Sequence, residues 1–188
     1  MAKQKNNIVM RTTRGMFGKQ VVFKRRAGKG YVAAPPETDE NRKPTPPQVE
    51  VQNLFTRATA FGKSVLRIPE LKAAYKAVAN RFQSAYNMAV KDAFNAPEVT
   101  TIFANGYRGV IGDSIIVQAT DDFKVNTVLV SIFNAENELL EEGAAIAMAD
   151  GKSWEYVATL DNPQLAGTKI KASAFDIPEN EGSLEVTL

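Results

Sequence analysis

Four side chains in the C-terminal half carry the oxygen atoms that a calcium ion prefers. Asp121, Asp122, Asp176 and Asn180 lie in turn-forming segments, and we expect these segments to gather at one pole of a β-sandwich. Carboxylate and amide oxygens are hard ligands that suit Ca²⁺. Aspartate and asparagine are also common in turns because they hydrogen-bond to nearby backbone, and no Asp-x-Asp-x-Asp-Gly loop is present. We therefore predict no resident metal or other cofactor and keep the four residues only as candidate calcium ligands.

The residue types that most often carry catalysis are missing. The chain has no cysteine and no histidine, which removes disulfides, thiolate nucleophiles, the usual zinc sites and the commonest general acid or base. Asp, Glu, Lys, Tyr or a bound metal would remain for an enzyme. No triad, metal motif or paired-carboxylate motif is found, so we predict that the protein is not an enzyme and has no catalytic residues.

Charge points to a different kind of chemistry at the N-terminus. Residues 1–36 contain nine lysines and arginines and no acidic residue. The chain has 23 basic and 21 acidic residues, which leaves 14 basic against 21 acidic outside this arm, so the arm is +9 and the body −7. Such a split predicts that one end binds something acidic, namely nucleic acid, a membrane or the body of another copy.

Seven residues of the arm are candidates for binding a partner. Cations alternate there with apolar and aromatic side chains, which can share a protein contact or stack on bases. No recognised nucleic-acid-binding fold accompanies them, so we favour docking of the arm on a neighbouring subunit. The candidates are Lys19, Val21, Phe23, Lys24, Arg25, Arg26 and Tyr31.

The elements that position these residues fall into successive blocks. Residues 1–36 form the basic arm, with a β-hairpin at about 17–34 because two β-prone runs flank turn-forming residues. An isolated hairpin is marginal in water, so it must pack on this chain or on a neighbour. Residues 37–47 are rich in proline and predict an extended linker.

Residues 48–96 are predicted to form an antiparallel helical pair. Thr45, two prolines and Gln48 match the start of a helix, and Asn95 and Pro97 end the second helix. Two helices bury little surface, so we expect part of the second helix, or the hairpin, to contact another chain. The apolar stripe of that helix, about 25 residues long, comprises Leu71, Tyr75, Val78, Phe82, Ala85, Ala89 and Val90.

Residues 107–188 change to a period of two and predict an immunoglobulin-like β-sandwich. Trp154 is expected in the core or at its edge. The whole chain is thus predicted as a multi-part α+β protein. The expected strands are 114–119, 128–132, 139–147, 154–158, 170–174 and 184–188.

Two resemblances accompany this pattern. The C-terminal block resembles bacterial immunoglobulin-like domains over residues 112–115, 119–123, 128–132, 151–156 and 174–180. The front half resembles a group of uncharacterised Bacteroidota proteins over residues 18–23, 43–48 and 84–95. The first resemblance implies a fold and is nearly silent on function. The second carries no activity, but some proteins of this layout look like components of phage or injection-particle assemblies.

We therefore predict a non-enzymatic structural subunit of a virion or particle. The arm and helices would mediate contacts with copies of the chain and with other structural proteins, and the sandwich would be displayed or bridge neighbours. The alternatives are a packaging protein that binds nucleic acid through the arm, and an adhesion or carbohydrate-binding module. No apolar run reaches the roughly 18 residues of a membrane helix, and no secretory signal is seen. We expect no membrane partner and synthesis in the cytoplasm, followed by residence in the particle or, alternatively, in the cytoplasm.

Overall fold

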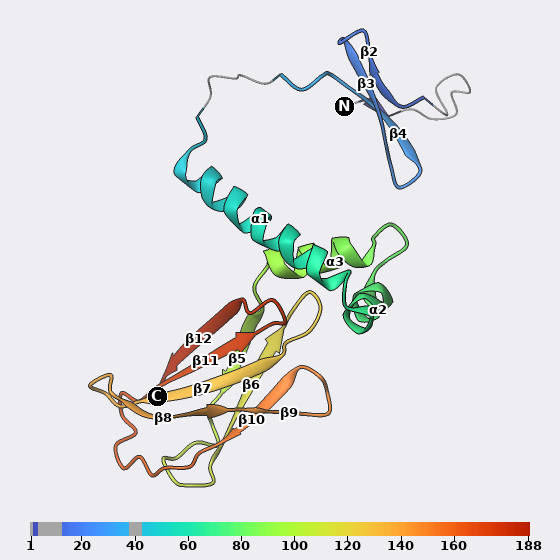
Figure 1. The fold of residues 1–188 in the computed structure, drawn as a ribbon. Coiled ribbons are helices and arrows are strands. Elements are labelled where there is room, and N and C mark those ends of the chain that lie inside the picture. Colours follow the sequence, from blue (N-terminus) through green and yellow to red (C-terminus); the bar gives the residue numbers. More distant parts are fainter. Residues whose placement is uncertain (1, 4–12, 38–42) are drawn as a thin grey trace. The chain divides into compact units, whose positions relative to one another are not determined.

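The structure is a computed structural model that describes residues 2–3, 13–37 and 43–188. Over these residues the protein is mixed α+β, with three helices and three antiparallel sheets (Figure 1). The chain divides into two compact units, Met1–Val49 and Glu50–Leu188. The predicted linker falls partly on residues 38–42, outside the described residues.

The first unit is a small sheet built around the predicted hairpin. Strands β3 and β4 pair through a turn at Ala27 and Gly28, whose φ angles of 51° and 78° suit the primed turns of two-residue hairpins. Two further strands extend the hairpin to the order β1-β4-β3-β2. The strands are β1 (Ala2–Lys3), β2 (Gly15–Phe17), β3 (Val21–Arg26) and β4 (Lys29–Ala33).

The first helix begins where the sequence predicts it. Helix α1 spans Pro46–Val65, and the backbone N–H of Thr45 donates to Oε1 of Gln48 at 3.0 Å. This contact is the glutamine half of a capping box.

The second predicted helix is wrong in one respect, because it is two helices. Helices α2 (Pro69–Val78) and α3 (Ala85–Phe94) are separated by residues 79–84. The side chain of Asn80 accepts from the N–H of Phe82, and Ser84 caps α3 by accepting from the N–H of Asn87. Such side-chain bonds compete with helical ones, so the predicted pair over residues 48–96 is a three-helix layer. Phe82, predicted on the buried stripe, is 62% exposed.

The helices share a small apolar core. Helix α1 approaches α3 closely at Gly62, where a Cβ would lie 2.7 Å from a methyl carbon of Val90. Phe123, from the loop after strand β6, packs on this core from outside the helical layer. The buried members are Val65, Tyr75, Ala85, Met88 and Ala89.

The rest of the second unit consists of two four-stranded antiparallel sheets. Their orders are β5-β6-β10-β9 and β12-β11-β7-β8. The segment predicted as one strand over residues 139–147 is two strands, β8 and β9, that belong to different sheets. The strands are β5 (Glu98–Phe103), β6 (Ser114–Thr120), β7 (Thr127–Phe133), β8 (Leu139–Ala144), β9 (Ile146–Ala147), β10 (Ser153–Val157), β11 (Lys169–Phe175) and β12 (Glu181–Thr187).

One core lies between the two sheets, which we call the two-sheet body (residues 98–188). Alternate side chains of β6, β7 and β11 point into it, as the period of two predicts. Trp154 is half-buried and packs against this core, which confirms its placement at the core edge. Fully buried members include Ile115, Val117, Val130, Ile132 and Ile170.

The predicted start of this body at residue 107 is too late. Strand β5 pairs with β6 along Glu98–Phe103 and buries Val99 and Ile102 in the common core. A bulge between Val99 and Thr101 shifts the register, so the two buried residues lie three apart. A bulge of this kind hides a strand from a search for strict alternation.

This boundary gives a testable difference between two fragments. Residues 96–188 contain every strand of the body and should unfold cooperatively on heating, whereas residues 107–188 lack β5 and uncover Val117 and Ile115 on β6. We expect the shorter fragment to be unfolded or molten, as measured by circular dichroism and calorimetry. Cooperative unfolding of the shorter fragment at the same temperature would show that β5 contributes nothing to the core.

Candidate functional site: a carboxylate cluster between helices and sheets

A buried aspartate stands at the end of the helical layer that faces the two-sheet body. Asp92 lies in the last turns of α3 and is 0% exposed. The hydroxyl of Tyr75, on α2, donates to its Oδ2 at 2.5 Å. Tyr75 is itself fully buried and stacks on Phe123 with ring centroids 4.1 Å apart. These contacts fix one oxygen of Asp92 and leave the other to point away from the helices.

Two aspartates from the loops of the body meet Asp92. Asp121 follows β6, and its Oδ2 accepts from the backbone N–H groups of Phe123 and Lys124 at 3.1 and 2.9 Å. Asp176 follows β11 and is 1% exposed. Its two oxygens accept from the backbone N–H and the side-chain amide of Asn180 at 2.6 and 2.7 Å.

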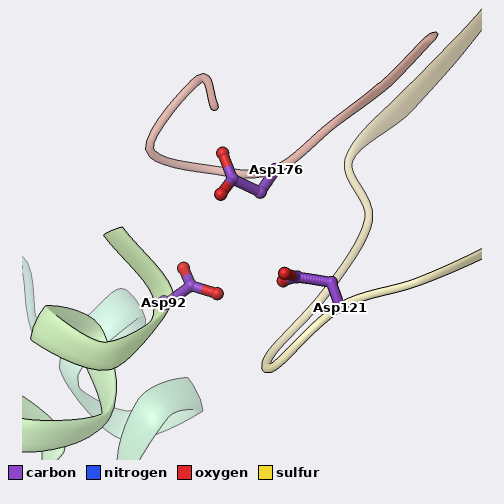
Figure 2. Close-up of side chains that lie close together, drawn as sticks. All are labelled: Asp92, Asp121 and Asp176. Carbon is purple, nitrogen blue, oxygen red and sulfur yellow. The ribbon is translucent and has the colours of Figure 1, made fainter. Parts of the chain in front are cut away.

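The three carboxylates converge on one space, as Figure 2 shows. One oxygen from each of Asp92, Asp121 and Asp176 lies within 4.8 Å of the others. Oδ1 of Asp92 and Oδ1 of Asp121 are buried and have no hydrogen-bond partner among the described residues. Over the same residues, neither ion pair of the structure involves the cluster. Three acids thus face one another without a neutralising cation from the described chain.

Burial and mutual repulsion perturb the acid strength of this cluster. Burial raises the pKa of Asp92 to about 8, and the neighbouring Asp121 and Asp176 add to the shift, while the hydrogen bond from Tyr75 opposes it. Burial likewise raises the pKa of Asp176, against the hydrogen bonds from Asn180. Burial and the Asp92 carboxylate raise the pKa of the Tyr75 hydroxyl. Without a cation, the cluster holds a proton more readily than ordinary aspartates do.

The four calcium candidates from the sequence divide into two pairs. Asp121 and Asp176 are brought together. Asp122 instead contacts α3, where it accepts from Nζ of Lys91 at 2.5 Å and from the amide of Asn95 at 2.6 Å. Burial alone would raise the pKa of Asp122, but the Lys91 ammonium and the Asn95 amide outweigh it and lower that pKa.

Asn180 supports the cluster with its nitrogen atoms. Its side-chain amide donates to Oδ2 of Asp176 and lies 3.4 Å from the backbone carbonyl oxygens of Asp92 and Asn95. Asn180 therefore links the β11–β12 turn to the end of α3.

Sequence reasoning missed Asp92, the third member of the cluster. The signal was present in the helical period, because Asp92 lies four residues after Met88 and seven after Ala85, on the same buried face. A charged residue on an apolar stripe is rarely buried without a partner. What the period could not supply was the identity of the loops that meet this face.

The structure distributes the predicted partner-binding residues over both faces of the arm sheet. Alternation along β3 places Val21, Phe23 and Arg25 on one face and Lys24 and Arg26 on the other. Tyr31 is paired with Lys24 and shares its face. Lys19 lies in the β2–β3 turn with a φ of 55°. The four cations are exposed, whereas Val21, Phe23 and Tyr31 are half-buried, so no single face displays the whole set.

An apolar groove of about 430 Å³ lies between α1 and α3. Phe55 of α1 is 54% exposed there, and its ring meets the ring of Phe94 edge to face at 6.5 Å. The groove is lined by Phe55, Thr59, Tyr86, Asn87, Val90, Lys91, Phe94 and Asn95.

Comparisons with known proteins add little to this description. No family model and no curated protein matches the sequence. A crystal structure of an engineered protein matches 54% of this chain and 24% of that chain, with 12% sequence identity and a TM-score of 0.31. That likeness is too low to support an argument about fold or function. Among the described residues, no helix is long and apolar enough to cross a membrane.

Proposed function

We propose that the protein is a non-enzymatic structural subunit that assembles with copies of itself. The observation that carries this proposal is the uncovered apolar groove between α1 and α3. Phe55 is more than half exposed there, although burying an aromatic side chain is worth several kcal/mol at an interface. A chain that keeps this surface open has a use for it.

The occupant that we propose is the arm sheet of a second copy. Strand β2 presents Met16 and Phe17, which are 55% and 75% exposed, and these apolar side chains suit an apolar groove. The charges of the two parts are opposite, at +9 for the arm and −7 for the remainder. Complementary charge speeds encounter and orients the partners, while apolar burial supplies most of the affinity.

We also infer that the two-sheet body is an immunoglobulin-like β-sandwich. In constant-type immunoglobulin domains, strands A, B, E and D form one sheet and strands C, F and G the other. Naming β5, β6, β7, β9, β10, β11 and β12 as A to G gives the orders A-B-E-D and G-F-C for the two sheets. Strand β8 then extends the second sheet next to β7. Such a body can be displayed on a particle or bridge neighbours, and the fold alone does not decide which.

The assembly that we propose is a virion or a similar particle. This part rests on the resemblance of the front half to Bacteroidota proteins of phage-like layout. The lack of histidine and cysteine favours a structural role over catalysis. In this account the arm and helices hold the subunits together.

Two matched variants on α1 test the role of the groove. Phe55→Ser should weaken self-association at least ten-fold, because a central aromatic contact is typically worth about 2 kcal/mol or more. Val51→Ser removes a side chain of similar exposure, 55%, that does not line the groove and should leave association unchanged. Sedimentation velocity over a concentration series measures both. Equal behaviour of the two variants would contradict the proposed interface.

Removal of residues 1–36 tests the proposed occupant. The truncated chain should fail to associate, and nucleic-acid binding by the full chain should stay negligible at physiological salt. The competing outcome is a packaging protein. In that case binding to duplex DNA would weaken with salt, and neutralising Lys24, Arg25 and Arg26 would flatten the slope by roughly two to three, at about 0.9 per lost phosphate contact. That result, with assembly of the truncated chain intact, would replace the present proposal.

A further inference from the structure

We propose that Asp92, Asp121 and Asp176 bind a divalent cation, with Ca²⁺ as the fitting ion, that fastens the helical layer to the two-sheet body. The three side chains come from α3, from the loop after β6 and from the loop after β11, all within the unit Glu50–Leu188. Figure 2 shows their carboxylates turned toward a shared space. The site goes beyond the proposed structural role and does not depend on it.

The separation of the oxygens suits a calcium ion. One oxygen from each residue lies within 4.8 Å of the others. Two ligands on opposite sides of a calcium ion are about 4.8 Å apart, since Ca–O distances are about 2.4 Å. Calcium also tolerates irregular arrangements of carboxylates, carbonyls and waters, whereas Mg²⁺ demands a near-ideal octahedron.

An unpartnered buried oxygen marks this cluster as more than a group of acids. Asp92 is 0% exposed, and its Oδ1 has no hydrogen-bond partner among the described residues. Leaving a buried acceptor unsatisfied costs about 1–3 kcal/mol, and more for a charged one. Oδ1 of Asp121 is in the same position. Both oxygens belong to the converging carboxylates, so a cation placed among them satisfies both at once.

The remaining oxygens are already held as the outer contacts of a metal site would hold them. Oδ2 of Asp92 accepts from Tyr75, and Oδ2 of Asp121 accepts from two backbone N–H groups. The oxygens of Asp176 accept from Asn180, and each carboxylate oxygen keeps a second lone pair for an ion. Ligating carboxylates in metal sites are commonly hydrogen-bonded in this way, which fixes their orientation.

The rival explanation is a proton shared among the three acids instead of a metal. Both a proton and Ca²⁺ relieve the repulsion, but only the metal makes stability depend on calcium concentration. The full-length protein, freed of metal with EDTA and dialysed, distinguishes the two. We expect calorimetric titration with CaCl₂ to show one site per chain, with a Kd in the range of about 10⁻⁵–10⁻³ M.

Thermal unfolding supplies the second readout. Calcium at a hundred-fold excess over its Kd should raise the Tm of the full-length protein by about 5 °C or more. Asp92→Asn keeps the shape of the side chain and removes its charge, and it should weaken calcium binding at least ten-fold. Glu136→Gln is the matched control. It removes one negative charge from an exposed loop residue and should leave the calcium response unchanged.

The outcomes separate the two explanations. Should Asp92→Asn fail to fold, Asp121→Asn provides the same test from the loop side. A wild-type protein with neither binding heat nor a Tm shift in calcium would overturn the proposal in favour of a shared proton. So would an unchanged calcium response in a folded Asp92→Asn or Asp121→Asn variant.

Discussion

Tyr75→Ala is expected to lower the free energy of unfolding by about 3–5 kcal/mol, the usual range for removing a large buried aromatic side chain. Tyr75 is fully buried, stacks on Phe123 and meets Phe61 edge to face. Phe123 belongs to the two-sheet body, so the substitution removes part of the contact between body and helices. We expect calorimetry of the variant to show the helical layer unfolding before the body.

Two further variants separate the contributions of Tyr75. Tyr75→Phe keeps the ring and removes only the hydroxyl that donates to Asp92, so it should cost about 1–3 kcal/mol, the price of an unsatisfied buried acceptor. Phe82→Ala truncates an aromatic side chain that is 62% exposed between α2 and α3. That change should stay within about 0.5 kcal/mol. A loss from Phe82→Ala as large as that from Tyr75→Ala would contradict the assigned packing.

Gly182→Ala is expected to destabilise the body by about 3 kcal/mol, at the upper end of overpacking costs. A Cβ at Gly182 would overlap the carbonyl oxygen of Pro97 and lie 2.8 Å from its carbonyl carbon. Because both partners are backbone, no side chain can rotate away. Strand β12 would have to separate from the chain that leads into β5, which joins the edges of the two sheets.

Ser183→Ala is the control for Gly182→Ala. Ser183 is the next residue of β12 and points to the exposed side, so its truncation should change stability by less than about 0.5 kcal/mol. Urea unfolding of both variants measures the difference. A Gly182→Ala protein as stable as the Ser183→Ala protein would mean that β12 does not pack against the start of β5.

Local patterns predicted most of the elements. The turn at Ala27–Gly28, the start of α1 at Pro46 and the alternation along β6, β7 and β11 each depend on residues close in sequence. Such features follow from backbone preferences and side-chain period, which act before any tertiary contact forms. The structure confirms them for that reason.

The missed features depend on irregularity or on contacts distant in sequence. The bulge in β5 moved Val99 and Ile102 out of alternation. The caps at Asn80 and Ser84 broke an apolar stripe that looked continuous. The carboxylate cluster required Asp92 to meet loops far along the chain, and no local pattern encodes that meeting.

The central claim, that this chain is a subunit which assembles through protein contacts, is tested most directly by the mass of the native full-length protein. Light scattering at micromolar concentration, with and without nuclease, gives that mass. The account predicts a multiple of 20.5 kDa that nuclease leaves unchanged. A mass of one chain, or a larger species that nuclease reduces to one chain, would contradict it.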